Sequence, residues 1–322
     1  MNPLAQNLNN QLVDHCPEIL SMLSNLGQSM YYPKGILSQS ADAKKTKYNA
    51  TIGMATNKNG KMYADTLFDV YNHLSPDEVF PYAPPQGLEA LRDLWQDKML
   101  KENPDLSKET ITRPIVTNAL THGLSLIADL FVESGDTVLV PTHNWGNYKL
   151  IYETRHSANI ETYSIFNQEG HYTTNDLVTT LENFNQDKVI LILNYPNNPT
   201  GYTPNNDEVT TIVSAVRSLA EKGTKVIAVV DDAYYGLFYE DVYRQSIFTA
   251  LNQIESSNIL PIRLDGATKE FFAWGLRVGF LTFGLNNNVA KEVLEAKVKG
   301  LIRSNISSGP MPSQSAIKYV LE

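Results

Sequence analysis

Seven segments of the chain are rich in apolar and β-branched residues, and in most of them these residues are continuous rather than alternating with polar positions. Such runs are typical of strands that are covered on both faces of a sheet. Each is short enough to be a strand and is bounded by polar or turn-forming residues. The runs occupy residues 114–118, 136–140, 159–165, 188–194, 225–230, 259–264 and 278–283.

Between several of these runs, apolar residues recur at the spacing of helices, at 87–100, 121–134 and 206–223. Strands that alternate with helices predict an α/β fold, a three-layer sandwich around a mainly parallel seven-stranded sheet. In sheets of this kind, ligands bind at the carboxyl ends of the strands. The functional residues are therefore expected just after the apolar runs.

The composition of the chain limits which classes of partner it can bind and indicates the cell compartment in which it is found. The net charge of −9 and the pI near 5.2 argue against nucleic acid, which requires a basic face. Cys16 is the single cysteine, so no internal disulfide is possible and a reducing cytoplasm is expected. The polar N-terminus is unlike a signal peptide, and no apolar run approaches the ~20 residues of a membrane span.

Three apolar runs end in unusual polar sequences. They are followed by Asn-Tyr-Pro-Asn-Asn-Pro-Thr-Gly at 194–201, Asp-Asp-Ala-Tyr-Tyr-Gly at 231–236, and Asp-Gly-Ala-Thr-Lys at 265–269, with Arg277 eight residues after Lys269. Alone, Asn-Pro-Thr-Gly is an ordinary turn, an Asp after a strand is often a helix cap, and a lysine is usually solvated. Together and in this order, they favour a functional site.

In this combination, these segments resemble those of the class I and II aminotransferases, the fold-type I enzymes that use pyridoxal 5′-phosphate (PLP). The resemblance is greatest to aspartate and aromatic aminotransferases and extends from about Asn49 to Pro310. It implies that Lys269 binds PLP as an imine and then moves the substrate proton. It also implies that Asp231 pairs with the pyridine nitrogen, while Asn198 and Tyr234 bind the phenolic oxygen.

The resemblance extends to the rest of a PLP site. Arg277 matches the arginine that binds the phosphate, and Thr268 precedes the lysine. Leu120 and Thr121 lie where a helix begins, so their backbone N–H groups would face the phosphate. The remaining matches are Trp145, expected to stack on the pyridine ring, and Tyr82, expected to reach the phosphate of a neighbouring subunit in a homodimer.

For the substrate, the resemblance implies contacts from Gly53, Trp145 and Asn198, and recognition of an acidic side chain by Arg303. Two positions depart from the family pattern. Ala119 stands where many relatives have Gly, and Gly266 stands where many have a Ser that binds phosphate. One hydrogen bond to the phosphate is therefore expected to be missing or to be replaced by neighbouring backbone donors.

The resemblance also implies a division into domains. Residues 1–62 are expected to form an N-terminal arm with part of a small domain, residues 63–300 the large PLP-binding domain, and residues 301–322 the start of a second part of the small domain. Family members usually continue for about a hundred residues more, in the part that supplies the arginine for the substrate carboxylate. The chain is accordingly interpreted as a fragment of a longer protein.

The leading hypothesis is transamination between an acidic or aromatic L-amino acid and a 2-oxo acid such as 2-oxoglutarate. A β-lyase or decarboxylase remains an alternative, because the fold fixes the cofactor rather than the reaction. A third hypothesis is an inactive fragment that binds PLP. The six histidines show no metal-ligand spacing, and there is no P-loop, Gly-x-Gly-x-x-Gly motif or nucleophile elbow.

Overall fold

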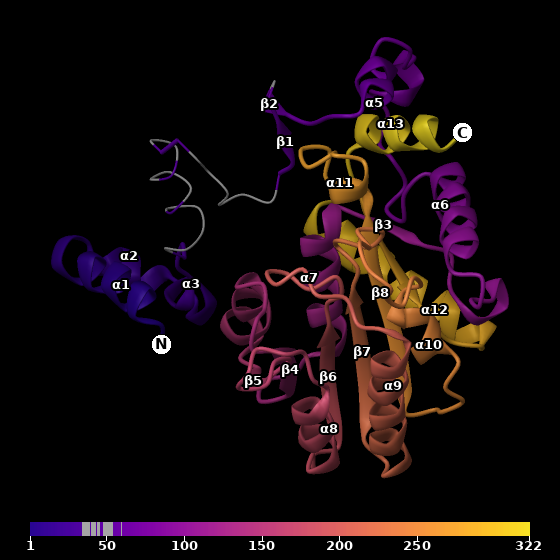
Figure 1. The fold of residues 1–322 in the computed structure, drawn as a ribbon. Coiled ribbons are helices and arrows are strands. Elements are labelled where there is room, and N and C mark those ends of the chain that lie inside the picture. Colours follow the sequence, from indigo (N-terminus) through magenta and orange to yellow (C-terminus); the bar gives the residue numbers. More distant parts are fainter. Residues whose placement is uncertain (34–38, 40–42, 44–45, 48–53, 59) are drawn as a thin grey trace.

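The computed structural model of the chain describes residues 1–33, 39, 43, 46–47, 54–58 and 60–322. Its centre is a seven-stranded sheet with the strand order β3-β9-β8-β7-β6-β4-β5 (Figure 1). All seven strands predicted from the apolar runs are present. Their bounds are Ile115–Thr117 (β3), Thr137–Pro141 (β4), Asn159–Tyr163 (β5), Lys188–Leu193 (β6), Lys225–Asp231 (β7), Ile259–Gly266 (β8) and Gly279–Phe283 (β9).

Most neighbouring strands of this sheet are parallel, as predicted. The exception is β9, which runs antiparallel to both of its neighbours, β3 and β8. β7 and β8 are parallel, and Asp231 at the end of β7 lies opposite Leu264 of β8. The carboxyl ends of these two strands therefore lie side by side, and the polar segments that follow them begin at one edge of the sheet.

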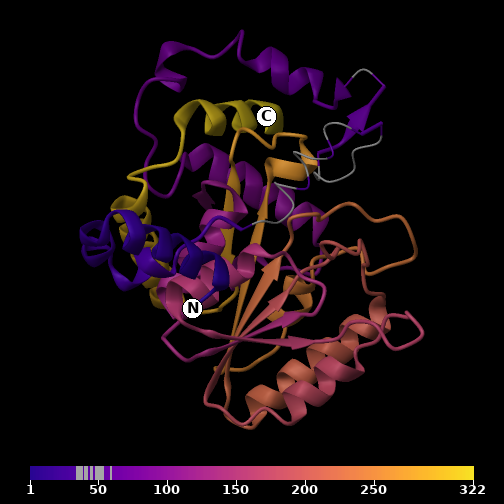
Figure 2. The same cartoon turned by 90° about the vertical axis from the view of Figure 1, so that its left-hand side faces the viewer.

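Helices cover both faces of the sheet and give the three layers (Figure 2). α8 (Asn175–Glu182), α9 (Asn206–Glu221) and α10 (Ile247–Asn252) share a core with one face of the sheet. α7 (Ala119–Phe131) and α12 (Asn288–Asn305) share a core with the other. Successive residues of a strand point to opposite faces, so Val230 belongs to the first core and Val229 to the second.

A third core lies beside β3 and β9, where α5 (Asp65–Val70), α6 (Glu89–Glu102) and α13 (Met311–Leu321) meet. Trp95 of α6 is fully buried there and stacks on Phe280 of β9, with ring centroids 4.0 Å apart. This packing holds α6 against the strands next to β8. It matters for function because α6 thereby lies close to the turn that follows β8.

The N-terminal residues form three short helices, which pack on one another at the side of the sheet in Figure 1. They are α1 (Pro3–His15), α2 (Pro17–Met22) and α3 (Asn25–Ser29), followed by the two-stranded hairpin β1 (Thr56–Asn57) and β2 (Gly60–Lys61). At the other end, α12 continues through residue 300, and the proposed domain division stays a prediction. No helix of the described residues is both long and apolar enough to cross a membrane.

Candidate active site

Asp231 is the last residue of β7 and is buried at the carboxyl edge of the sheet. The hydroxyl of Tyr148 donates a hydrogen bond to Asp231 Oδ2 at 2.6 Å, and the Ala233 N–H donates to Oδ1 at 3.2 Å. Burial raises the pKa of the Asp231 carboxyl, while Tyr148, Ala233 and the charge of Lys269 lower it. The carboxylate is thus held in place, but its charge is incompletely compensated.

Lys269 lies in α11 (Ala267–Glu270), the short turn directly after β8. Its ammonium nitrogen is 5.0 Å from the centroid of the Tyr234 ring. Burial lowers the pKa of this amine, the charge of Asp231 raises it, and that of Arg277 lowers it. Because β7 and β8 are adjacent parallel strands, Lys269 follows the strand end next to that of Asp231, and its amine is influenced by charges from two other segments of the chain.

Arg277 lies in the loop between α11 and β9. Its φ of 57° is in the left-handed region, where a residue with a side chain costs of order 1 kcal/mol or more. Its Nη1 donates to the carbonyl of Trp274 at 3.2 Å, and burial lowers its pKa. The surrounding structure therefore fixes this cation in an unfavourable backbone conformation on the same side as Lys269.

The start of α7 packs closely on the glycines of β8 and β9. A Cβ atom at Gly279 would lie 2.8 Å from the carbonyl carbon of Ala119 and 3.0 Å from the Leu120 nitrogen. Ala119 itself has a φ of 61°, which explains physically why glycine suits this position in similar sequences. The first N–H groups of α7, including those of Leu120 and Thr121, are thereby brought beside the end of β8.

The close packing also explains why Gly266 departs from the family pattern. A Cβ atom at Gly266 would lie 2.7 Å from both the Gly279 Cα and the Val278 carbonyl oxygen, so a serine does not fit. Two residues further on, Thr268 is buried, and its hydroxyl has no hydrogen-bond partner among the described residues. Thr268 can supply the hydroxyl donor that Gly266 lacks.

Replacing Gly266 with serine is expected to destabilise the protein by about 1–3 kcal/mol, because the obstructing atoms belong to the backbone. Urea unfolding of the two proteins measures this difference. Gly275→Ser is the matched control, since nothing lies within 4 Å of a Cβ atom there, and its effect should stay within about 0.5 kcal/mol. Equal stability of the two variants would contradict the proposed close packing.

The Asn-Pro-Thr-Gly segment is tied to Asp231 by Asn194, the first residue after β6. The Asn194 side-chain oxygen accepts from the Asn198 N–H at 2.7 Å, and its amide donates to the Asp231 carbonyl at 2.8 Å. Tyr234 is partly buried, and burial, followed by the charge of Asp231, raises its pKa. Asn194 thus holds Asn198 next to the segment that carries both Asp231 and Tyr234.

Trp145 is partly buried and contacts Tyr148 edge to face, with ring centroids 5.7 Å apart. Since Tyr148 donates to Asp231, the indole ring is brought to the same region as the carboxylate. Two residues that were not predicted from the sequence, Tyr148 and Asn194, therefore organise the site. Asn194 begins the segment 194–201 and Tyr148 lies three residues after Trp145, but only the three-dimensional structure gives their partners.

Two of the predicted residues, Tyr82 and Arg303, are not brought to this centre within the single chain. The Tyr82 side chain is 91% exposed, and Arg303 is exposed near the end of α12, where it donates to the Ser307 hydroxyl. Gly53 lies outside the described residues. The roles of Tyr82 and Arg303 were predicted across a subunit boundary, so a single chain does not test them.

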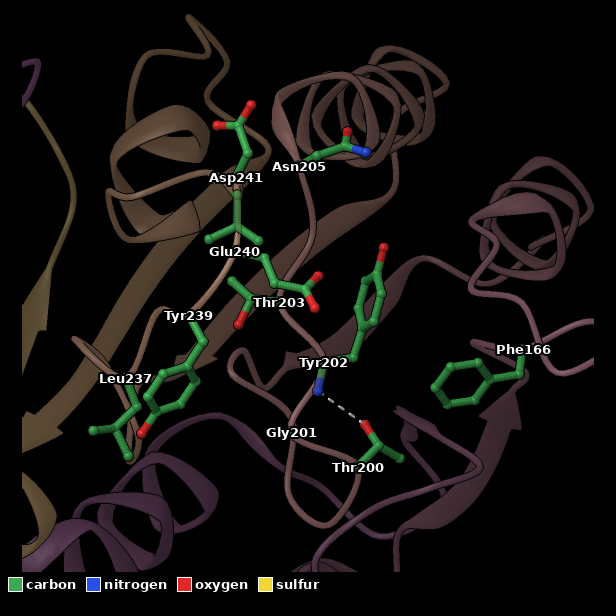
Figure 3. Close-up of a pocket in the computed structure, with 11 residues that line it drawn as sticks. Phe166, Thr200, Gly201, Tyr202, Thr203, Asn205, Leu237, Tyr239, Glu240 and Asp241 are labelled. Carbon is green, nitrogen blue, oxygen red and sulfur yellow. Dashed lines mark hydrogen bonds between the residues drawn. The ribbon is translucent and has the colours of Figure 1, made fainter.

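A separate pocket lies beyond Asn198, between the Asn-Pro-Thr-Gly segment and the loop that follows Tyr234 (Figure 3). Its volume is about 430 Å³, and its lining includes Thr200, Tyr202 and Glu240. The Tyr202 N–H donates to the Thr200 hydroxyl at 3.3 Å. None of Lys269, Asp231 and Arg277 lines this pocket, so it is distinct from the centre described above.

Comparison with known proteins identifies the family. The family model for aminotransferases of class I and II matches residues 51–321. The chain belongs to this family. The family is PLP-dependent, which confirms the predicted cofactor class.

Several known proteins are similar to this class I and II aminotransferase. The aromatic-amino-acid aminotransferase of Escherichia coli (strain K12) is 25% identical over 291 residues, 87% of this chain and 70% of that protein. A histidinol-phosphate aminotransferase of Ruminiclostridium cellulolyticum is 34% identical over 56% of this chain and 45% of that protein. The crystal structure of an aminotransferase from Anaerococcus prevotii has the same fold, with a TM-score of 0.81 at 20% identity, covering 93% and 75% of the two chains.

The residues present fit PLP. The phosphate requires cations and donors. Arg277, the first turn of α7 and the Thr268 hydroxyl, which has no partner among the described residues, supply them at the end of β8 that leads to Lys269. The pyridine nitrogen requires a partner that stabilises its protonated form, and the buried carboxylate of Asp231 can do so. The buried indole N–H of Trp274 is a further donor without a partner among the described residues.

Proposed function

We propose that this aminotransferase moves an amino group between an acidic or aromatic L-amino acid and a 2-oxo acid such as 2-oxoglutarate, with PLP. The observation that carries the proposal is the placement of Asp231, Lys269 and Arg277 at neighbouring strand ends. The buried Asp231 ends β7, Lys269 lies in the turn after the adjacent parallel strand β8, and Arg277 lies just before β9, whose first residue pairs with the last residue of β8. These are the three charged groups that the cofactor and the proton transfer require.

Bound PLP supplies an electron sink for the negative charge that develops at the α-carbon of the amino acid. Asp231 would hold its ring nitrogen, Arg277 with the first turn of α7 and Thr268 its phosphate, and Trp145 one face of its ring. Asn198 and Tyr234 would hold the phenolic oxygen. Tyr148 keeps the Asp231 carboxylate in one orientation through its 2.6 Å hydrogen bond.

Lys269 is the general base of the proposal. Because burial lowers its pKa, the amine is neutral at a lower pH than that of an ordinary lysine and can accept a proton at Nζ. Tyr234 contacts the amine through its ring and limits the positions that Nζ can occupy. Proton transfer at the substrate α-carbon is therefore assigned to Lys269, with Asp231 and Tyr234 as its neighbours.

We further propose that the enzyme is a homodimer with shared sites and acts in the cytoplasm. Tyr82 and Phe80 are 91% and 83% exposed, which favours a surface that a second subunit covers. Tyr82 would then reach the phosphate in the partner's site. The cytoplasmic location is supported by the single cysteine, Cys16, which is free.

Arg303 is proposed to bind the side-chain carboxylate of an acidic substrate across the dimer. Arg303→Ala is expected to lower kcat/KM for glutamate and aspartate by about 30-fold or more, because a charged pair lost from a site costs about 2–5 kcal/mol. Activity toward phenylalanine or tyrosine should fall much less. Lys297→Ala, an exposed cation on the same helix, is the control, and full activity of Arg303→Ala toward aspartate would refute this role.

A product analysis tests the proposed reaction itself. The PLP-loaded protein is incubated with glutamate or an aromatic amino acid, with and without a 2-oxo acid acceptor. Transfer of the amino group only when the acceptor is present supports the proposal. Release of ammonia, pyruvate or carbon dioxide without an acceptor would instead indicate a lyase or decarboxylase, and no product from any substrate would favour an inactive PLP-binding protein.

A further inference from the structure

A cluster of three buried charged residues lies at the ends of β7 and β8. Arg263 of β8 is 1% exposed, and Asp232 and Asp265 are 3% and 5% exposed. Arg263 Nε donates to Asp232 Oδ2 at 2.7 Å, and its Nη2 is 3.4 Å from Asp265 Oδ2. The proposed reaction assigns no role to any of them.

The cluster lies behind Asp231, on the opposite face of the sheet. Arg263 pairs in register with Val230, whose side chain belongs to the core under α9. Asp231 pairs with Leu264, whose side chain belongs to the α7 core together with that of Tyr148. Because side chains alternate along a strand, the cluster and the Asp231 carboxylate lie back to back at the same strand ends.

The cluster and the residues around it contact the residue that directly follows each proposed catalytic residue in the sequence. Asp232 follows Asp231 and binds Arg263 directly. Tyr235 follows Tyr234, and the Arg263 guanidinium lies 4.6 Å from the centroid of its ring. The contact to the third neighbour, Glu270, runs through α6.

Glu270 follows Lys269 and is bound by Lys98 of α6 at 2.6 Å. Lys98 lies 4.9 Å from the ring centroid of Trp95, and the Trp95 indole N–H donates to Asp265 Oδ2 at 3.1 Å. The α6 side chains thus connect Asp265 of the cluster to the turn that carries Lys269.

Stability alone does not explain such a cluster. Buried ion pairs often contribute no more to stability than well-packed apolar residues of the same volume. Here one cation faces two carboxylates, and Arg263 Nη1, Asp232 Oδ1 and Asp265 Oδ1 have no partner among the described residues. Unlike apolar packing, the cluster makes directional contacts, because each charged hydrogen bond fixes the position of its partner.

We infer that Arg263, Asp232 and Asp265 are positioning residues that fix Asp231, Tyr234 and Lys269 relative to one another, through the residue that follows each of the three. The inference rests on the proposed function for the catalytic roles of Asp231, Tyr234 and Lys269. The placement of these three residues relative to one another can be measured without the cofactor.

The test compares Arg263→Met with Arg92→Met, which removes a second arginine that is also 1% exposed. Arg92 donates to the Pro114 carbonyl at 2.7 Å and pairs with Glu295 at 2.8 Å and Glu89 at 3.2 Å, and none of these partners belongs to β7, β8 or the segments that follow them. Both variants remove one buried cation of the same size. Any effect common to the two is a general loss of stability, which thermal unfolding records.

Arg263→Met is expected to accelerate amide hydrogen exchange at 231–235 and 266–271 in the protein without PLP, whereas Arg92→Met should not. In the PLP-loaded enzyme, kcat should fall by about 10- to 100-fold with little change in KM, because small misplacements of reacting groups have effects of that size. The pH midpoint of the absorption of bound PLP should also shift. Identical exchange, kcat and midpoint in the two variants would overturn the inference.

A second pair of variants covers the case in which Arg263→Met does not fold. Asp232→Ala removes the acceptor of Arg263 Nε, and Asp232→Asn restores an acceptor of the same size without the charge. The loss of kcat in the alanine variant should be largely recovered by asparagine, and an alanine variant within about twofold of the natural protein would overturn the inference. A natural protein that binds no PLP would refute the proposed function alone, since the exchange experiment is made without the cofactor.

Discussion

Replacing Lys269 with alanine is expected to abolish turnover, with a fall in kcat of at least about 10⁴-fold. Proton transfer by a positioned side chain accounts for about 10²–10⁴-fold of catalysis, and the covalent bond to the cofactor is lost as well. The reason is structural, since Lys269 lies in the turn after β8, next to the strand that ends in Asp231, and its amine lies over the Tyr234 ring. Steady-state kinetics of the PLP-loaded variant measures this loss.

The same variant should still bind PLP without a covalent bond, because Arg277, Thr268 and the first turn of α7 are unchanged. Lys225→Ala is the control: Lys225 is exposed at the opposite end of β7 and should leave kcat unaltered. A Lys269→Ala protein that keeps a PLP adduct after borohydride reduction would show that the cofactor is bound to another amine.

Replacing Asp231 with asparagine is the second change with a large expected effect. Loss of the negative charge opposite the ring nitrogen should weaken PLP binding by about 30-fold or more, since breaking a buried charged pair costs about 2–5 kcal/mol. The exchange of the substrate α-proton for deuterium should slow to a similar or greater degree. Asparagine keeps an oxygen that can accept the hydrogen bond of Tyr148, so the change is confined to the charge.

The same substitution, which weakens PLP binding, should not lower the stability of the protein in the absence of PLP. Burial raises the pKa of Asp231, so the stability contributed by its neutral form is lost as pH rises above the ordinary carboxyl range. At about pH 7 the Asp231→Asn protein should therefore unfold at a temperature at least as high as the natural protein. The difference should shrink as the pH falls toward about 4. A variant that is less stable at neutral pH would contradict the burial of an uncompensated charge.

The sheet was predictable because its signal is local. Most strands of the sheet are continuous apolar runs, although β5 at the sheet edge mixes polar with apolar residues and is largely exposed. The predicted bounds differ from the observed ones by only one or two residues, as in 225–230 against Lys225–Asp231. The direction of β9 was not predictable, because a buried strand has the same pattern whichever way it runs. The short helices α8, α10 and α11 were also not predicted, since each has fewer than three turns of periodic sequence.

The chemistry of the site was only partly predictable, for a related reason. Lys269, Asp231 and Arg277 belong to short motifs, which the resemblance to aminotransferases identified. Tyr148 is 83 residues from the Asp231 carboxylate to which it donates, and nothing in its own segment indicates that partner. Likewise, the clash that excludes a side chain at Gly266 comes from the neighbouring strand and not from its own sequence.

The measurement that tests the central claim most directly is peptide mapping of the natural chain after reconstitution with PLP and reduction with borohydride. Trypsin cleaves after Arg263, Lys269 and Arg277, and a modified lysine resists cleavage. The account predicts a single peptide that spans residues 264–277 and carries the cofactor. Recovery of the two separate peptides 264–269 and 270–277, with the cofactor on another lysine or on none, would contradict it.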